Sequence, residues 1–164
     1  MSREDLLMPD FIGTAPISKP AFILGKVSGL ACCLFFLVKI HDPNLMLYDG
    51  PANRAAAIVL LSVGLVVAGL AVMKLGKSTR PGLSDDITKL RTTGIYGVSR
   101  NPLYLGGSVV CLACCCYSLH WLNFLFAFVT VAVHHRIVLA EERFLEAKFG
   151  DDFRRYRGRV RRYL

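Results

Sequence analysis

The sequence predicts an all-α integral membrane protein, a bundle of about four transmembrane helices with a C-terminal interfacial helix. Three observations lead to this fold class. The 164 residues are 54% hydrophobic, which is too apolar for a small soluble domain with a polar surface. The apolar residues gather in four long runs, and most charged residues lie between or after them. The basic residues also concentrate on one predicted side of the bundle.

The four apolar runs predict the helices in order. A helix needs about 20 apolar residues to cross a hydrocarbon core of about 30 Å. The first two runs reach that length alone, and the last two reach it with flanking polar residues. One helix over both of the last runs would overshoot the bilayer, so the "SLH" between them predicts a hairpin turn. The runs occupy residues 21–40, 55–73, 103–117 and 121–133.

The spans divide the chain into three predicted regions. Residues 1–19 are rich in proline and glycine, which predicts an irregular arm. Residues 20–142 form the predicted four-helix transmembrane domain, including a cytoplasmic loop at 76–99 that is too long for a simple connector. Residues 143–164 are predicted to form a basic helix in the cytoplasm or at the membrane interface. Within that region Gly150 predicts a break.

The charge distribution predicts topology and favours a membrane over a nucleic-acid partner, because the basic residues flank the predicted spans. The net charge is +8, yet of 20 lysines and arginines only Lys39 and Arg54 fall near the side that holds the hairpin turn. Such asymmetry follows the positive-inside rule, so both termini and the 76–99 loop are expected in the cytoplasm. The expected membrane is the inner membrane of a bacterium or the endoplasmic reticulum of a eukaryote. The tail "RRYRGRVRRYL" is expected to contact anionic lipid head groups.

The six cysteines lie within predicted helices one and three, two of them spaced as Cys111-x-x-Cys114. No histidine pair stands at ligand spacing and no loop wraps around them. We therefore expect packing residues and no metal site.

Two polar clusters flank the predicted hairpin, at 93–107 and at 134–150. The start of helix three and the end of helix four must be neighbours, so these clusters are expected to meet. On helix four, His135 shares a face with Glu142, whereas Arg136 points elsewhere. A pocket that uses Arg136 and a glutamate together needs another element to close it, for which the 76–99 loop is the obvious candidate. The structural alternative is an ion pair from Arg100 that merely locks the hairpin.

The stretches "GIYGVSRNPLYLG" and "RIVLAEERFLEAKFGDDFRRYRGRV" resemble the isoprenylcysteine carboxyl methyltransferase and phospholipid methyltransferase superfamily of membrane enzymes. The resemblance covers roughly residues 76–160. Asn101 replaces the histidine of the first family block, and Phe153 replaces the first tail tyrosine of the second. The matching residues are Gly94, Tyr96, Arg100, Pro102 and Tyr104 in the first block, and Arg136, Glu141, Glu142, Leu145, Phe149, Gly150 and Tyr156 in the second.

The resemblance implies a methyltransferase that depends on S-adenosyl-L-methionine and acts on a lipophilic small molecule or lipidated acceptor. It implies catalytic roles for Arg136, which would position the acceptor, and for Glu142. Pro102 at the first turn of helix three presets the entry of that helix. The implied cofactor-binding residues are Tyr96, Arg100, Asn101, Pro102, Tyr104, Leu105, Gly106, His135, Glu141 and Glu142.

Two other functions remain open from the sequence. Sterol reductases have a similar C-terminal block and bind NADPH, so a membrane reductase is one alternative. The other is a non-enzymatic membrane adaptor in which the charges only pin the hairpin. The methyl acceptor stays open as well, since a carboxylate, a phospholipid amine and a thiol all suit the pattern.

Overall fold

The structure is a computed structural model that describes residues 18–42, 50–75 and 89–164, and every long element in these ranges is a helix. The all-α prediction is therefore confirmed. The predicted arm lies outside the described residues up to residue 17, and so does the loop over residues 76–88. The elements are α1 (Lys19–His41), α2 (Pro51–Leu75), the 3-10 helix η4 (Gly94–Gly97), α3 (Pro102–Ser118), α4 (Trp121–Phe149) and α5 (Asp151–Arg159).

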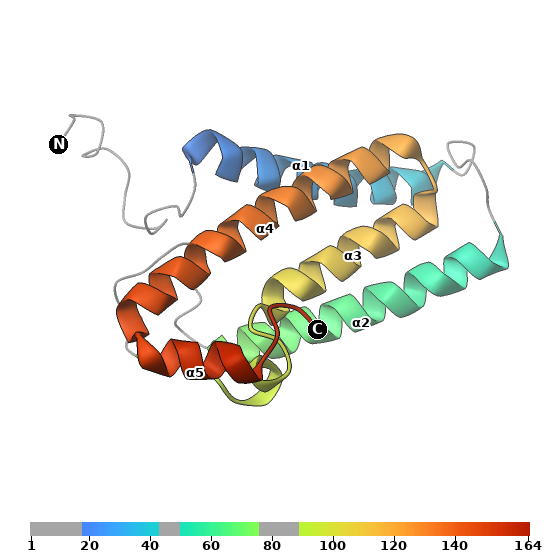
Figure 1. Cartoon of the computed structure of the whole chain (residues 1–164). Coiled ribbons are helices and arrows are strands. Elements are labelled where there is room, and N and C mark those ends of the chain that lie inside the picture. The colour runs from blue at the N-terminus through green and yellow to red at the C-terminus, as the bar shows by residue number, and fades with distance from the viewer. Residues whose placement is uncertain (1–17, 43–49, 76–88) are drawn as a thin grey trace.

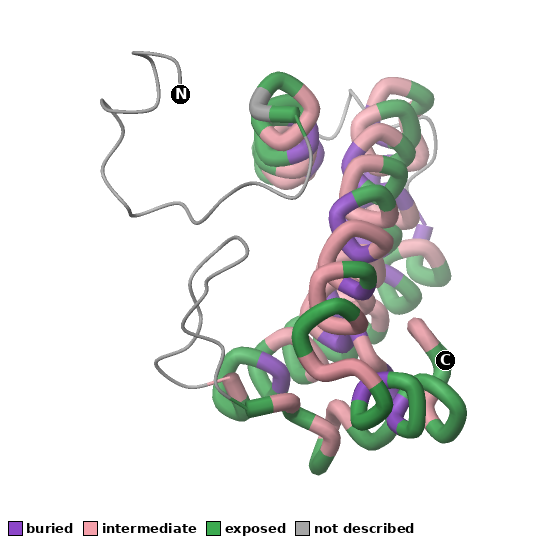
Figure 2. The backbone as a smooth tube through the Cα atoms, turned by 60° about the vertical axis from the view of Figure 1, so that its left-hand side comes forward, coloured by how far each residue is buried: buried purple, intermediate pink, exposed green. Residues whose placement is uncertain are grey.

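Helices α1, α2 and α4 are each long and apolar enough to cross a membrane. Helix α3 is apolar too, but its 17 residues extend only about 25 Å at 1.5 Å per residue. Many large apolar side chains on α1 and α2 face outward, for example Leu30 with 61% and Ile58 with 65% of their surface exposed. Figure 2 shows exposed residues along the outer faces of the helices and buried residues between them. In water such faces would drive aggregation, so they are the surface that faces lipid.

The four long helices alternate in direction, with α2 beside α3 and α1 beside α4 (Figure 1). Glycines allow both pairs to approach closely. A Cβ atom on Gly106 would lie 2.7 Å from the backbone nitrogen of Ala68, and one on Gly64 would lie 2.9 Å from the carbonyl oxygen of Gly106. On the other pair, a Cβ on Gly25 would overlap Val133. This is the small-residue packing expected between helices in lipid, where apolar burial gives little driving force.

The buried cysteines contribute to the core. Cys32 of α1 packs with Cys111 and Cys114 of α3, all of them at most 5% exposed. All six cysteines are free. Among the residues described, no group of three or more histidine, cysteine or acidic side chains has metal-binding geometry.

A tight turn joins α3 to α4, as the sequence predicts. Leu119 adopts a left-handed conformation with φ of 43°, and the ring of His120 accepts a hydrogen bond from the backbone of Leu122 at 3.2 Å. The buried Asn123 then donates to the carbonyl of Cys114 at 3.1 Å and to Ser118 at 3.0 Å. These bonds fix the hairpin, so the opposite ends of α3 and α4 are held near each other.

Helix α4 ends at Phe149, and the predicted break occurs at Gly150, whose φ is +51°. The helix passes without interruption through residues 142 and 143, where the sequence suggests the end of the transmembrane region. Helix α5 stops at Arg159, and residues 160–164 are not helical. Arg100 accounts for the C-terminal end of α5. Its Nη1 donates to the carbonyls of Arg157 and Val160 at 3.1 and 2.8 Å.

Candidate functional site

The two polar clusters meet at one end of the bundle. Asn101 immediately precedes α3, and Pro102 occupies the first turn of that helix as the sequence predicts. The amide Nδ2 of Asn101 donates to Oε1 of Glu142 on α4 at 3.3 Å. Because the amide is directed to α4, it makes no side-chain cap for α3. The start of α3 and the end of α4 are thus in direct polar contact through Asn101 and Glu142. We call this region, where the two family-like blocks of sequence meet, the corner.

Arg100 and Glu142 form a buried ion pair at the centre of this corner. The guanidinium donates to Oε1 of Glu142 from Nε at 3.1 Å and from Nη2 at 2.9 Å. The two side chains are only 7% and 9% exposed. Burial costs both charges their hydration, so the pair is stable only with further hydrogen bonds. Asn101 and the carbonyls at the end of α5 supply those bonds.

The C-terminal tail closes the corner from outside. Arg162 donates to Oε2 of Glu142 from Nε at 3.1 Å and from Nη2 at 2.8 Å. Its carbonyl accepts from Ser99 at 3.2 Å and from Asn101 at 3.3 Å. The bond to Glu142 raises the pKa of Arg162 above its ordinary value. The basic tail therefore contributes directly to the site, a role that the sequence does not reveal because its arginines equally suit a topology signal.

A second carboxylate, Glu141, lies beside the first but belongs to a separate contact. Tyr104 of α3 donates to Oε1 of Glu141 at 2.7 Å. The ring of His134 stands against the ring of Tyr104, with centroids 5.3 Å apart. Nδ1 of His134 is buried, and no described residue forms a hydrogen bond with it. Tyr104 thus contacts both a buried imidazole nitrogen without a described partner and a carboxylate with one oxygen that no described residue engages, and unpaired polar atoms of this kind suit a polar ligand.

Helix η4 is fastened to α5 at the edge of the corner. The hydroxyl of Tyr156 donates to the carbonyl of Tyr96 at 2.6 Å. Burial raises the pKa of both tyrosines to about 12. Both hydroxyls therefore stay protonated through neutral pH, and the bond holds η4 in place.

The remaining predicted site residues are spread more widely. His135 reaches the tail, with its Nδ1 3.0 Å from the hydroxyl of Tyr163. Arg136 is exposed on α4, and it makes no ion pair with the described residues. Gly106 faces α2, where it serves the close helix contact, and Leu105 is half-buried beside it. The structure thus gathers Tyr96, Arg100, Asn101, Pro102, Tyr104, Glu141 and Glu142 at the corner, and adds Ser99, His134 and Arg162.

Comparison with known protein families gives one match. A family model described as phospholipid methyltransferase matches residues 52–152, from the start of α2 to the first turn of α5. No curated protein and no solved structure matches the chain. The matched region contains Arg100, Asn101, Glu141 and Glu142, whereas Arg162 lies beyond it.

Proposed function

The chain belongs to the phospholipid methyltransferase family, and from this membership we propose that it transfers a methyl group from S-adenosylmethionine to a lipophilic or amphiphilic acceptor. The family and the apolar helices make the chain an integral membrane methyltransferase. The observation that carries the proposal is the contact between Asn101 and Glu142. It joins the stretch before α3 and the end of α4, which carry the two family-like sequence blocks, into one polar corner at the end of the bundle.

The chemistry of the corner fits the methyl donor. S-adenosylmethionine offers an ammonium, ribose hydroxyls, a carboxylate, an aromatic base and a sulfonium. Glu141 has an oxygen that no described residue engages, and Nδ1 of His134, whose ring stands against Tyr104, is buried without a hydrogen-bond partner among those residues. The aromatic faces of Tyr96 and Tyr104 suit a cationic sulfonium or a base. This set offers acceptors, donors and ring surfaces within one corner.

We assign the binding roles as follows. Glu141 binds the ammonium or the ribose hydroxyls, and Tyr96 and Tyr104 flank the base or the sulfonium. Arg100 and the start of α3, where the helix dipole favours an anion, would hold the cofactor's carboxylate. Glu142 has both oxygens bonded to Arg100, Asn101 and Arg162. Its proposed role is therefore to orient these groups.

The cofactor supplies the electrophilic methyl group when bound. The chain's own contribution is alignment of the two reactants and exclusion of water. The low exposure of Arg100 and Glu142 supports this role, because these two side chains are largely protected from solvent. We propose that the exposed Arg136 positions an acidic acceptor, as its family counterpart is expected to do. The predicted topology gives a soluble donor access from the cytoplasm and a lipidic acceptor access from the bilayer.

Calorimetric titration with S-adenosylhomocysteine tests this proposal on the purified full chain in detergent. We expect saturable binding by the wild type and at least a tenfold loss of affinity in Glu141→Gln. Glu146→Gln is the matched control, because Glu146 lies on the same helix but pairs with Arg154 and Arg157 outside the corner. No binding by the wild type, or displacement of the bound ligand by NADPH, would overturn the proposal and favour the adaptor or the reductase.

A further inference from the structure

The last residues of the chain, 160–164, lie against the corner through hydrogen bonds of their backbone as well as through a side chain. The carbonyl of Arg161 accepts from the backbone nitrogen of Arg100 at 3.0 Å. The carbonyl of Arg162 accepts from Ser99 at 3.2 Å and from Asn101 at 3.3 Å. These bonds hold the side chain of Arg162 beside the corner, although Arg162 lies beyond the region that the family model matches.

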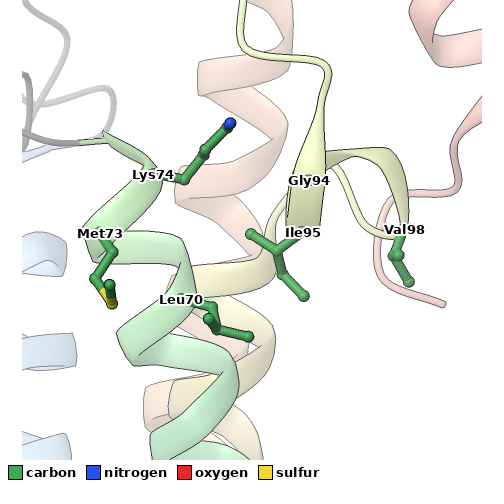
Figure 3. A pocket seen from close by; sticks show the side chains of 6 residues that line it. All are labelled: Leu70, Met73, Lys74, Gly94, Ile95 and Val98. Atoms are coloured by element: carbon green, nitrogen blue, oxygen red, sulfur yellow. The ribbon is translucent and has the colours of Figure 1, made fainter.

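The stretch that receives these residues follows η4, and η4 is held from two sides. On the side of α5, Tyr156 donates to the carbonyl of Tyr96 at 2.6 Å. On the other side η4 contacts α2, and Figure 3 shows Leu70 of α2 and Ile95 of η4 extending toward each other across the groove that they line. The position of Arg162 is therefore set before a ligand arrives, which lowers the cost of binding.

Two guanidinium groups share the single carboxylate of Glu142. Nη2 of Arg100 donates to Oε1 at 2.9 Å, and Nη2 of Arg162 donates to Oε2 at 2.8 Å. Among the described residues, no second acidic side chain pairs with either arginine. The adjacent Glu141 bonds to Tyr104 instead and interacts electrostatically with Lys26 of α1. The cluster thus carries an excess positive charge, and such a charge is stabilised by an anion when it is partly removed from water.

Arg162 is the arginine of this cluster that a ligand can reach. The guanidinium of Arg100 donates from all three nitrogens to Glu142 and to two carbonyls, and its side chain is only 7% exposed. The guanidinium of Arg162 donates to Glu142 from Nε and Nη2, and its side chain is 33% exposed. Because a guanidinium carries five N–H donors in a planar fork, the Nη1 edge of Arg162 is left for a second carboxylate.

We propose that Arg162 binds the carboxylate of the methyl donor, beside Arg100 and the start of α3, so that residues 160–164 form part of the donor site. The inference rests on the proposed function. The carboxylate is the anionic group of S-adenosylmethionine, and its shape matches the guanidinium fork. The residues that carry Arg162 follow α5, outside the predicted spans, so they meet a ligand that arrives from water.

Two ligands that differ in the carboxylate alone test this contact on the purified full chain in detergent. One is S-adenosylhomocysteine, and the other is its decarboxylated analogue, which keeps the ammonium on a 3-aminopropyl chain. In calorimetric titrations we expect the wild type to bind S-adenosylhomocysteine at least about tenfold more tightly than the analogue. Arg162→Gln should reduce that preference to about twofold or less, through weaker binding of S-adenosylhomocysteine.

The ratio of the two affinities distinguishes a direct contact from a structural role. Equal losses of affinity for both ligands in Arg162→Gln would mean that Arg162 only supports the fold, and would overturn the proposal. Arg161→Gln is the matched control and should keep the preference, because Arg161 is exposed and bonds to the corner through its carbonyl. Arg162→Lys keeps the charge without the fork, so it should show an intermediate preference and replaces Arg162→Gln should that variant fold poorly.

Protection of the C-terminus gives a second measurement on the wild type. A carboxylate bound to Arg162 holds the last residues against the corner, so S-adenosylhomocysteine should slow their removal by a carboxypeptidase at least about threefold. The decarboxylated analogue should give little protection. Faster removal in the presence of S-adenosylhomocysteine would show that the last residues leave when the ligand enters, and would overturn the proposal.

The wild type also separates this inference from the proposed function. If it binds neither ligand, the methyltransferase proposal fails and the role of Arg162 fails with it. If it binds both ligands with equal affinity, the methyltransferase proposal stands and the role of Arg162 alone is overturned.

Discussion

Glu142 shows at the scale of one residue why the corner is sensitive to substitution. Its two oxygens accept from Arg100, Asn101 and Arg162, and its side chain is only 9% exposed. Removing one partner of a buried ion pair leaves the other charge uncompensated, at a cost of about 3–5 kcal/mol. Such a loss is large against the stability of a typical domain.

We therefore expect Glu142→Gln to lower the midpoint of thermal unfolding in detergent by about 6 °C or more. Glu146→Gln changes the same atoms on the same helix, but Glu146 is 34% exposed and pairs with exposed arginines. Surface pairs contribute about 0–1 kcal/mol, so the control should stay within about 2 °C of the wild type. Equal midpoints for the two variants would contradict the buried pair.

The bond from Tyr156 to Tyr96 gives a prediction that depends on pH. Burial raises the pKa of Tyr156 to about 12, against about 10 in an unfolded chain. A group whose pKa is raised on folding stabilises the fold below the unfolded pKa, and this stability is lost as the pH rises toward the folded value. The hydroxyl thus stabilises η4 fully at neutral pH and loses its effect between about pH 10 and pH 12.

Accordingly, Tyr156→Phe should unfold at a lower temperature than the wild type at pH 7 and pH 9, by an amount that does not change between them. The difference should shrink as the pH rises above about 10. Thermal unfolding followed by circular dichroism measures both. A difference that stays constant above pH 10 would show that the hydroxyl ionises in the folded protein at its ordinary pKa, which would contradict the buried bond.

The contact between Asn101 and Glu142 could be predicted from the sequence, whereas the contact between Glu142 and Arg162 could not. A hairpin between two apolar runs forces the start of one helix against the end of the other, so the pairing follows from topology alone. Arg162 reaches the corner only because α5 turns back at Gly150 and ends at Arg159. That path depends on the hydrogen bonds from Arg100 to the carbonyls at the end of α5. No local sequence pattern predicts these bonds.

At the scale of elements, the contact between α2 and α3 depends on two glycines. A Cβ atom on Gly106 would lie 2.7 Å from the nitrogen of Ala68 and 2.8 Å from the oxygen of Gly64. These are backbone atoms of a neighbouring helix, so neither can rotate away. Any side chain at Gly106 must push the two helices apart.

Gly106→Ala is therefore expected to destabilise the bundle by about 1–3 kcal/mol, the usual cost of overpacking. Gly107→Ala is its matched control, because a Cβ on Gly107 meets nothing within 4 Å and alanine favours the helix by up to about 1 kcal/mol. Thermal unfolding of both variants in one detergent should show opposite shifts. A tolerated Gly106→Ala would mean that the helices are not held so closely.

The C-terminal tail, residues 160–164, is attached to the helix bundle through the side chain of Arg162. Arg162 forms two hydrogen bonds with Glu142 and is 33% exposed, whereas the neighbouring Arg161 is an exposed residue that accepts a bond from Arg100 through its carbonyl only. Hydrogen bonds to charged groups contribute about 1.5–3 kcal/mol when protected, and partial exposure reduces that figure through solvent screening.

For the pair Arg162→Gln and Arg161→Gln we expect a lower unfolding temperature, by about 2–4 °C, in the first variant only. Faster cleavage of the C-terminus by a carboxypeptidase should accompany it, because the tail loses its anchor. If both variants behaved alike, the tail would be held by its backbone and not by this ion pair.

At the scale of the whole molecule, hydropathy alone predicts most of the architecture. The outer faces of the helices contact lipid and need no polar side chains, so the helices can be apolar on every face. Each helix therefore appears in the sequence as a continuous apolar run. Helix α4 is longer than its apolar run of 121–133, since the helix continues beyond it into the polar residues of the corner. The order of packing, with α3 between α2 and α4, could not be predicted in this way. It depends on close contacts such as that between Gly64 and Gly106, and a single glycine in the sequence does not indicate which other helix it faces.

The orientation in the membrane is the last prediction at this scale. Basic residues of α5, the tail and the end of α2 gather at the end of the bundle that carries the corner. By the positive-inside rule we expect this end in the cytoplasm, where the proposed donor S-adenosylmethionine is available. In a bacterial host, a fluorescent protein fused after Leu164 should therefore fluoresce, and alkaline phosphatase fused there should be inactive. A phosphatase fused after Asp42, at the opposite end of α1, should be active. Reversed activities would place the corner on the outer side of the membrane and remove its access to the donor, which would leave the methyltransferase without a cofactor supply.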